Sequence, residues 1–252
     1  LLLSLARDRR RWLLVGPAAV RTAEFHRRRA DRLLHSITDL GPSFVKLGQI
    51  FAGRTDLLPD AYAEALNTLT DRVPPVPYAQ IAATITAERG APPSAVFEAF
   101  DAEPLAAGSL GQVHRGRHNG REVAVKVLRP GVRELVATDV RVAGAIAARV
   151  ARWWPNVHTR AMNAIVDEFA RRIGEEMDFT QEAANLRAVR ANFVGNPRIR
   201  VPEVVDELSG RNVLVMEFVA GVRIDALDPT ARYGGLSVAT VVERLQELYI
   251  QM

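Results

Sequence analysis

An Asn-Gly pair between two alternating runs of residues constrains this chain more than any other local feature. Residues 110–118 and 121–128 flank Asn119-Gly120. Asn-Gly is a strong signal for a tight β-hairpin, because both residues tolerate the positive φ angles that the turn needs. The sequence therefore predicts an antiparallel hairpin near the middle of the chain.

Helical patterns lie on both sides of this hairpin. Apolar periodicity predicts helices at 17–36, 42–53, 58–70 and 78–89 before it, and at 132–153, 160–193 and from 237 after it. Further strands are expected at 97–103, 199–207 and 212–219. A small antiparallel sheet with attached helices predicts the α+β class.

Composition is that of a globular protein, with 48% hydrophobic and 25% charged residues. No apolar run reaches the roughly 18 residues of a membrane span, and the absence of cysteine fits a reducing compartment. Residues 1–35 hold nine arginines against three acidic residues, an excess of six positive charges. Such an arm suits anionic lipid or nucleic acid, although a solvated helix face is its commoner cause.

Lysine is rare in this sequence. Of the 33 basic residues only Lys46 and Lys126 are lysine. Arginine thus serves at ordinary solvated positions, and the two lysines mark places that favour a compact ammonium over a planar guanidinium. Chance retention of two ordinary lysines is the alternative.

The region around Lys126 has the pattern of a phosphate-binding loop and strand. The loop at 106–113 keeps two of the three glycines in the kinase spacing G-x-G-x-x-G-x-V, and glycines let backbone N–H groups approach phosphate oxygens. Ala124 and Lys126 share one face of the following strand, which leaves room for a flat base. An ordinary turn and an edge lysine pointing to water are the alternatives; the order of loop, hairpin and lysine favours nucleotide binding. The expected loop contacts are Ala106, Ala107, Gly108, Ser109, Gly111 and Val113.

Two later segments complete this pattern. Asp178 and Glu182 lie four residues apart on one helix face, and a buried lysine needs a carboxylate partner to stay charged. The apolar run 213–216 continues into Glu217-Phe218-Val219 and resembles a kinase hinge, whose backbone groups read the adenine edge. A solvated acidic face and an ordinary buried strand are the alternatives.

Lys46 and Gln49 share a face of the predicted helix 42–53. Gly48 between them costs about 1 kcal/mol relative to alanine in a helix interior. That cost predicts close approach of another backbone. A polar stripe on a packing helix is the alternative.

With these motifs the chain resembles the UbiB/AarF-type atypical kinases, the ubiquinone-biosynthesis kinase-like family, over about residues 38–252. The most specific likeness is Lys46-Leu47-Gly48-Gln49, the family's K-x-G-Q motif. The alanine-rich loop followed by His114, and the E-x-D motif Glu176-Met177-Asp178, are the others. The resemblance implies a helical extension over 1–92, a kinase-like N-lobe over 93–221 and the start of a second lobe over 222–252.

The resemblance also implies roles for the nucleotide-site residues. Lys126 would pair with Glu182 and contact the phosphates of ATP or ADP bound with Mg²⁺. Glu217 to Val219 would hold adenine through backbone groups.

A regulatory role is implied for the K-x-G-Q helix, which would lie across the site and restrict access to protein substrates. Lys46 and Gln49 would meet Glu176 and Asp178 there. On an ideal helix residues 176 and 178 diverge by about 200°, so both can face the site only where the helix is irregular or just beginning.

Two departures from the family matter. Gly108 stands where family members commonly have alanine, which implies a looser loop and leaves the nucleotide preference open. The catalytic loop H-x-D-x-x-x-x-N and the metal-binding D-F-G do not occur in the sequence. We therefore expect an N-terminal fragment that is inactive alone and lacks most Mg²⁺ ligands.

The implied parent protein is an atypical kinase or ATPase that supports quinone or isoprenoid-lipid metabolism, cytoplasmic and peripheral at a membrane or membrane-anchored. Its expected partners are adenine nucleotide and a membrane lipid, or a lipid or protein of the quinone pathway, with no nucleic acid. A pseudokinase-like module that senses nucleotide or lipid without phosphoryl transfer is the alternative, and downstream catalytic motifs would discriminate. A small-molecule kinase of the choline-kinase type would share the lobe but not the Lys46 helix.

Overall fold

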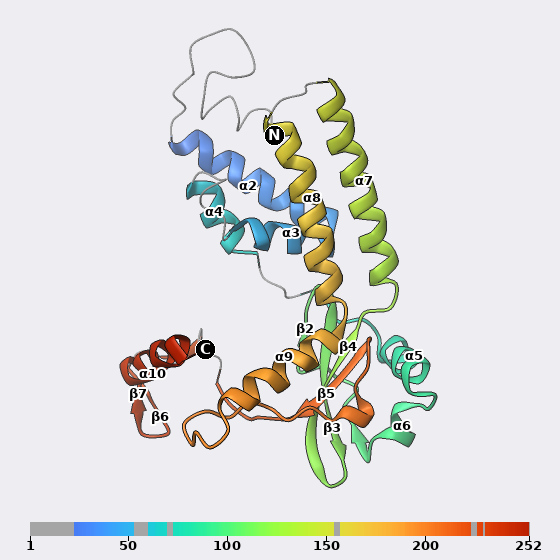
Figure 1. The fold of residues 1–252 in the computed structure, drawn as a ribbon, viewed down its shortest axis with the longest axis vertical. Coiled ribbons are helices and arrows are strands. Elements are labelled where there is room, and N and C mark those ends of the chain that lie inside the picture. The colour runs from blue at the N-terminus through green and yellow to red at the C-terminus, as the bar shows by residue number, and fades with distance from the viewer. Residues whose placement is uncertain are drawn as a thin grey trace. The chain divides into compact units, whose positions relative to one another are not determined.

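The computed structural model describes residues 23–52, 60–69, 73–153, 157–222, 226–228 and 230–251. The chain divides into two compact units that alternate along the sequence. Unit 1 comprises Leu1–Pro74, Ala107–Leu110 and Arg133–Ala170, and unit 2 comprises Pro75–Ala106, Gly111–Val132 and Arg171–Met252. Helices and a small antiparallel sheet make up the molecule (Figure 1), so the predicted α+β class is confirmed.

Unit 1 is helical. Its helices are α2 (Ala23–Leu40), α3 (Pro42–Ala52), α4 (Asp60–Asn67), most of α7 (Val132–Trp153) and α8 (Val157–Glu176) as far as Ala170. Gly41, with φ of +100°, separates α2 from α3, and Pro42 opens α3 where its missing N–H costs nothing. α2 runs four residues past its predicted end, and the expected start at 17–22 lies outside the described residues.

The sheet of unit 2 has the strand order β1-β3-β4-β5, with β2 also paired to β3. The strands are β1 (Ala99–Phe100), β2 (Ala106–Ala107), β3 (Gly111–His118), β4 (Arg121–Leu128) and β5 (Val213–Glu217). The predicted hairpin joins β3 to β4, with φ of 51° at Asn119 and 71° at Gly120. Lys126 therefore lies on a strand with neighbours on both sides, not on an edge.

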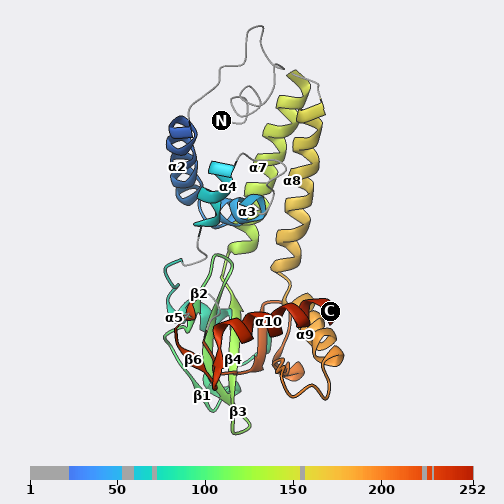
Figure 2. The same ribbon diagram turned by 90° about the vertical axis from the view of Figure 1, so that its left-hand side faces the viewer.

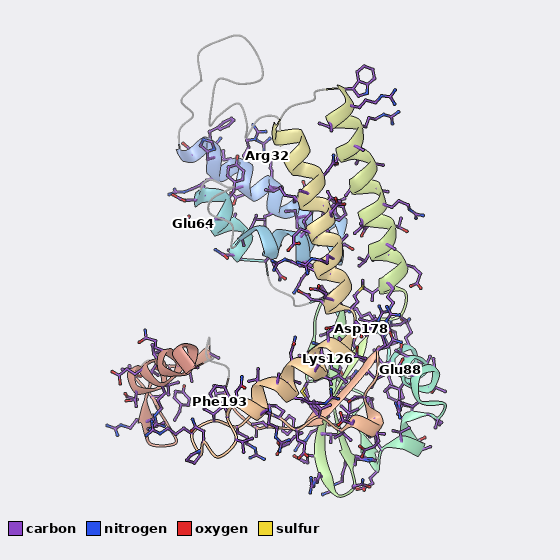
Figure 3. All side chains as sticks on the ribbon, viewed as in Figure 1. Arg32, Glu64, Glu88, Lys126, Asp178 and Phe193 are labelled. Atoms are coloured by element: carbon purple, nitrogen blue, oxygen red, sulfur yellow. The ribbon has the colours of Figure 1, made fainter. Side chains whose placement is uncertain are left out.

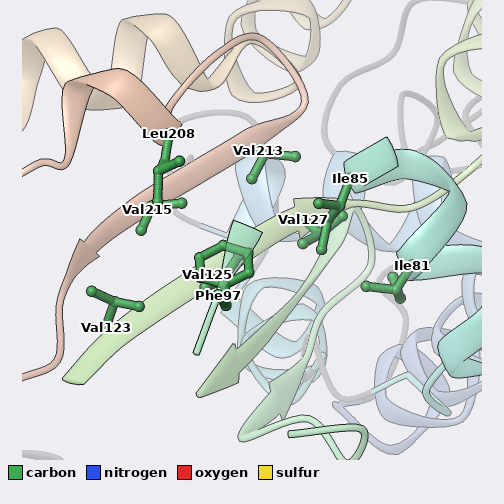
Figure 4. Packing of buried hydrophobic residues seen from close by; sticks show 9 residues of the cluster. All are labelled: Ile81, Ile85, Phe97, Val123, Val125, Val127, Leu208, Val213 and Val215. Carbon is green, nitrogen blue, oxygen red and sulfur yellow. The ribbon is translucent and has the colours of Figure 1, made fainter. Parts of the chain in front are cut away.

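One face of the sheet packs on helix α5 (Tyr78–Arg89) and supplies the core of unit 2. Period-two alternation sends Val123, Val125 and Val127 of β4 into this core. Figure 4 shows them packed with the other members of the cluster, Ile81, Ile85, Phe97, Leu208, Val213 and Val215. Ala124 and Lys126 consequently lie on the opposite face, as the alternation predicts.

Three predicted elements differ most from what was expected. The helix over 160–193 is two helices, because α8 ends at Glu176 and Asp178 caps the start of α9 (Phe179–Asn192). The strand over 199–207 is reduced to a bridge between Val204 and Met216, followed by the 3-10 turn η1 (Asp206–Leu208), since Pro202 has no N–H for a ladder. The strand over 97–103 shrinks to β1.

Smaller elements were not foreseen. They are α6 (Pro93–Val96) and the hairpin of β6 (Arg232–Tyr233) and β7 (Leu236–Ser237). Gly234-Gly235, both at positive φ, turns this hairpin. The expected last helix is α10 (Val238–Gln251). Within the described residues, no helix is both long and apolar enough to cross a membrane.

Candidate functional site

The centre of the candidate site is an ion pair between β4 and the first turn of α9. Lys126 Nζ lies 2.9 Å from Glu182 Oε1 and 2.6 Å from Oε2, so the ammonium binds both carboxylate oxygens. The two side chains keep 31% and 38% of their surface exposed. Figure 3 labels Lys126 beside α9. The ion pair therefore joins two residues whose pairing the sequence predicted, and both side chains remain partly exposed.

Phe179 supports this pair and was not foreseen. Its ring centroid lies 4.9 Å from Lys126 Nζ, within range of a cation–π contact. The side chain is 1% exposed, and its backbone N–H donates to the Arg211 carbonyl at 3.1 Å. The buried ring and its anchored backbone hold the start of α9 against β4, which fixes Glu182 opposite Lys126.

Gly111 lies where β3 approaches this cluster. A Cβ atom at Gly111 would be 2.8 Å from the Val127 carbonyl oxygen and 3.5 Å from Phe179 Cζ. Real Cβ atoms do not come so close to a carbonyl, so the strand spacing here requires glycine. Val113, two residues on, is the register partner of Lys126.

The other predicted loop residues divide between the two units. Ala106 belongs to unit 2, whereas Ala107, Gly108 and Ser109 belong to unit 1. Within unit 2 the Leu105 N–H donates to the Val113 carbonyl at 2.7 Å and anchors the entry to the loop. Contact of Ala107, Gly108 and Ser109 with a nucleotide at Lys126 stays a prediction.

The hinge-like segment uses two of its backbone donors inside unit 2. The Glu217 N–H donates to the Glu203 carbonyl at 2.8 Å, and the Phe218 N–H donates to the Glu122 carbonyl at 3.1 Å. The Glu217 carboxylate forms an ion pair with Arg200, whose hydrogen bond holds the pKa of Glu217 below its usual range. Both N–H groups are thus engaged within the fold.

A buried polar chain lies beneath β3. Gln112 and His114 are fully buried. Gln112 Oε1 accepts the Val76 N–H, its Nε2 lies 3.3 Å from His114 Nε2, and His114 Nδ1 lies 2.9 Å from the Asp101 carbonyl oxygen. Because the glutamine nitrogen only donates, His114 accepts at Nε2 and donates from Nδ1, which is the neutral ring. Burial lowers the pKa of His114 and favours this neutral form.

The K-x-G-Q residues lie on α3 in unit 1. Gln49 Nε2 donates to the Leu69 carbonyl at 3.3 Å. A Cβ at Gly48 would overlap Leu69 Cδ1 and lie 3.4 Å from Leu66 Cδ2. The expectation of close approach was right, but its partner was wrong: leucine side chains crowd Gly48, not another backbone. Glycine leaves the space that these leucines fill.

Glu176 and Asp178 lie in unit 2, at the break between α8 and α9. Asp178 Oδ1 accepts from the Thr180 N–H at 3.1 Å and hydroxyl at 2.6 Å, and Oδ2 lies 3.3 Å from Arg211 Nε. The irregular backbone that both acidic residues would need is therefore present. Contact of Glu176 and Asp178 with Lys46 and Gln49 would be a contact between the two units, and it stays a prediction.

In the part of the chain that the structure describes, no three His, Cys, Asp or Glu side chains are grouped so that they could hold a metal ion. A shallow cavity of about 470 Å³ is lined mainly by apolar atoms of the segment 221–245, including Leu227, Tyr233 and Leu245. Lys126 and Glu182 do not line it, so the cavity and the ion pair are separate features.

Known proteins resemble this chain over most of its length. The model of a family described as "ABC1 atypical kinase-like domain" matches residues 68–252. The "Probable protein kinase UbiB" of Marinobacter nauticus is 36% identical over 222 residues, which are 88% of this chain and 40% of that protein. "Protein ACTIVITY OF BC1 COMPLEX KINASE 8, chloroplastic" of Arabidopsis thaliana is 39% identical over 207 residues, 81% of this chain and 27% of that protein.

A solved structure is also similar. It is that of Rv3197 from Mycobacterium tuberculosis, in complex with erythromycin, with a TM-score of 0.55 and 30% identity over 81% of this chain and 51% of that one. The chain thus spans well under two thirds of each relative named here. The family match and the identities support one conclusion: this chain belongs to the ABC1/UbiB family of atypical kinase-like proteins.

Proposed function

We propose that this chain is the adenine-nucleotide-binding part of an atypical kinase or ATPase, with ATP or ADP bound through its phosphates at Lys126. The observation that carries the proposal is the bidentate Lys126–Glu182 pair, partly exposed beside a strand that requires Gly111. The residues 93–221 then serve as a kinase-like N-lobe, and 1–92 as its helical extension.

In this role Lys126 supplies a positive charge to the phosphates. Glu182 holds the lysine in one position through both carboxylate oxygens, which lowers the entropy lost when a phosphate binds. A lysine on the strand after a glycine loop, paired with a helix glutamate, is the arrangement by which kinases position phosphates. Gly111 lets the loop backbone come close, so that N–H groups can donate to phosphate oxygens.

Adenine is assigned to the end of β5. The N–H groups of Glu217 and Phe218 donate within unit 2. The Glu217 carbonyl and the Val219 N–H are therefore the groups proposed to accept from and donate to the base. Ala124, small and 9% exposed, leaves room for its flat ring.

The remaining roles are proposed by analogy with the family. Mg²⁺ would neutralise phosphate charge, with most of its ligands outside this chain. The K-x-G-Q helix would limit access of protein substrates through Lys46 and Gln49. The parent protein is proposed to act on the quinone or isoprenoid-lipid pathway as a cytoplasmic protein at the membrane surface.

The test is nucleotide-dependent thermal stabilisation of the full-length protein. Mg²⁺-ATP or Mg²⁺-ADP at about 100 times its Kd should stabilise the folded state by about 2.7 kcal/mol. Lys126→Arg should lose most of this shift, because the planar guanidinium does not reproduce the compact ammonium. Arg187→Lys, which alters the exposed Arg187–Asp206 pair of unit 2, should keep it.

Two results would count against the proposal. They are no shift in the unmodified protein, and equal shifts in the unmodified protein and in Lys126→Arg. Binding together with release of phosphate from ATP would support the kinase or ATPase. Binding of nucleotide without turnover would instead support the pseudokinase-like module.

A further inference from the structure

Helix α7 exposes four large apolar side chains in unit 1. Leu135, Val142, Ile146 and Trp153, here called the α7 stripe, are 45%, 51%, 58% and 72% exposed. At 100° per residue they lie within about 40° of one another on the helix surface. The stripe is therefore a continuous apolar face about 27 Å long at 1.5 Å per residue.

A flank of α7 that lies about 100–120° from the stripe is buried. Val136 and Ala147 are each 2% exposed. A Cβ at Gly144 would lie 4.0 Å from Val166 Cγ1 of α8, and α7 and α8 run side by side in both views (Figures 1 and 2). α8 therefore leaves the α7 stripe uncovered.

Two charged residues complete the stripe. Asp139 and Arg149 lie within about 40° of Leu135 on the same face. The positions 135, 139, 142, 146, 149 and 153 alternate in steps of four and three, which is the a/d spacing of a coiled coil. Among the described residues, no ion pair uses Asp139 or Arg149.

The stripe is self-complementary in one orientation only. Along the helix, its positions are spaced symmetrically on either side of residue 144. A second, antiparallel copy centred at the same level would therefore place Leu135 opposite Trp153, Val142 opposite Ile146, and Asp139 opposite Arg149. Every layer then pairs apolar with apolar or negative with positive. A parallel copy would place each charged residue opposite its own kind, which is unfavourable.

We propose that the α7 stripe is a homodimer interface, in which two copies of this chain pack α7 antiparallel about a two-fold axis at Gly144. A two-fold interface uses the same patch on both subunits, and such a patch must complement itself. An anionic membrane fits less well, because the Asp139 carboxylate lies within the stripe, between Leu135 and Val142, and would face the lipid headgroups.

Charge reversal tests the proposal by sedimentation velocity of the full-length protein from about 1 to 100 µM. The unmodified protein should dimerise in this range. Asp139→Arg and Arg149→Asp should each raise the dimer dissociation constant about tenfold or more, because like charges then face each other. The double variant D139R/R149D should restore dimerisation, and an equimolar mixture of the two single variants should form a heterodimer.

Three results would overturn the interface. They are a monomer at every concentration, single variants that dimerise normally, and a double variant that fails to recover. Vesicles of phosphatidylserine and phosphatidylcholine test the membrane instead: tighter binding by Asp139→Arg, weaker binding by Arg149→Asp and no dimer would assign the stripe to lipid.

Cross-linking reports the direction of packing, and this chain has no cysteine to interfere. Val142→Cys mixed with Ile146→Cys should give a disulfide-linked dimer under mild oxidation, because the two positions face each other in the antiparallel pair. A dimer formed mainly by Val142→Cys with itself would show parallel packing and overturn the proposal.

Discussion

Lys126 Nζ lies 2.6 Å from Glu182 Oε2 across 56 residues of sequence, joining β4 to α9. Because both side chains remain partly exposed, the pair contributes little to stability and is better suited to orient the lysine. Glu182→Gln should therefore change the free energy of unfolding by no more than about 1 kcal/mol while it removes most nucleotide-dependent stabilisation. Denaturant unfolding with and without Mg²⁺-ATP measures both.

The matched control is Asp206→Asn, which also removes one carboxylate from an ion pair of unit 2, with Arg187. It should retain the nucleotide effect in full. Equal losses in the two variants would mean that Glu182 acts through general stability and not by orienting Lys126.

Gly111→Ala tests the close approach of β3 to Val127. The new methyl would lie 2.8 Å from a backbone oxygen that cannot easily move, and we expect a loss of about 1–3 kcal/mol in the free energy of unfolding. Gly174→Ala is the control, because a Cβ there meets nothing within 4 Å. On helix α8 that change should stabilise the protein by about 0.5–1 kcal/mol. Chemical denaturation measures both variants. An unchanged free energy of unfolding in Gly111→Ala would contradict this account.

Elements that begin or end at a residue with a strong conformational preference were predicted correctly. Asn119-Gly120 placed the β3–β4 hairpin, and Gly90, which adopts the left-handed conformation, ended α5 where expected. The break before α9 was missed although Asp178 and Gln181 have the spacing of a capping box. The apolar periodicity of a helix continues on both sides of the break, so the pattern predicted one helix over 160–193.

Long-range contacts explain most of what sequence reasoning could not find. The Phe179 ring beneath Lys126 depends on how α9 packs on β4, and no spacing in the sequence encodes that distance. Likewise Gly48 indicated a close contact but not which atoms make it, and only the structure identifies Leu69 and Leu66. Lys126 and Glu182 were found because their residue types carry chemistry that the surrounding motifs made specific.

Glu88 is the clearest unforeseen contact in unit 2. Its carboxylate accepts from the Arg211 N–H at 2.6 Å, the Asn212 side chain at 2.7 Å and the Asn212 N–H at 3.3 Å, which ties α5 to the turn before β5. Glu88→Gln should lower the free energy of unfolding by about 1.5–3 kcal/mol, since the charge is lost and one acceptor oxygen becomes an NH₂ group that cannot accept from Asn212. Glu98→Gln, which affects one bond to the Gly120 N–H, should cost less. Equal costs for the two variants would contradict the bracing role.

His114 makes stability depend on pH. Its pKa in the folded protein lies below the ordinary histidine value of 6.5 because the ring is buried. The unfolded chain therefore takes up a proton near pH 6.5 that the folded ring does not accept. The free energy of unfolding should fall as the pH drops below 6.5, by at most about 1.4 kcal/mol per pH unit, and should stop falling below the folded pKa. His114→Asn should reduce this slope in urea titrations between pH 5 and 7.5; an unchanged slope would exclude His114 as its source.

The most direct test of the nucleotide site uses the rarity of lysine. An acyl-phosphate derivative of ATP transfers its acyl group to a lysine amine beside the bound phosphates and releases ATP, and this chain offers only Lys46 and Lys126. Mass spectrometry of the labelled protein should find the acyl group on Lys126, and excess Mg²⁺-ATP should suppress it. An unlabelled Lys126, or labelling that excess ATP does not reduce, would contradict the assignment of Lys126 to the nucleotide phosphates.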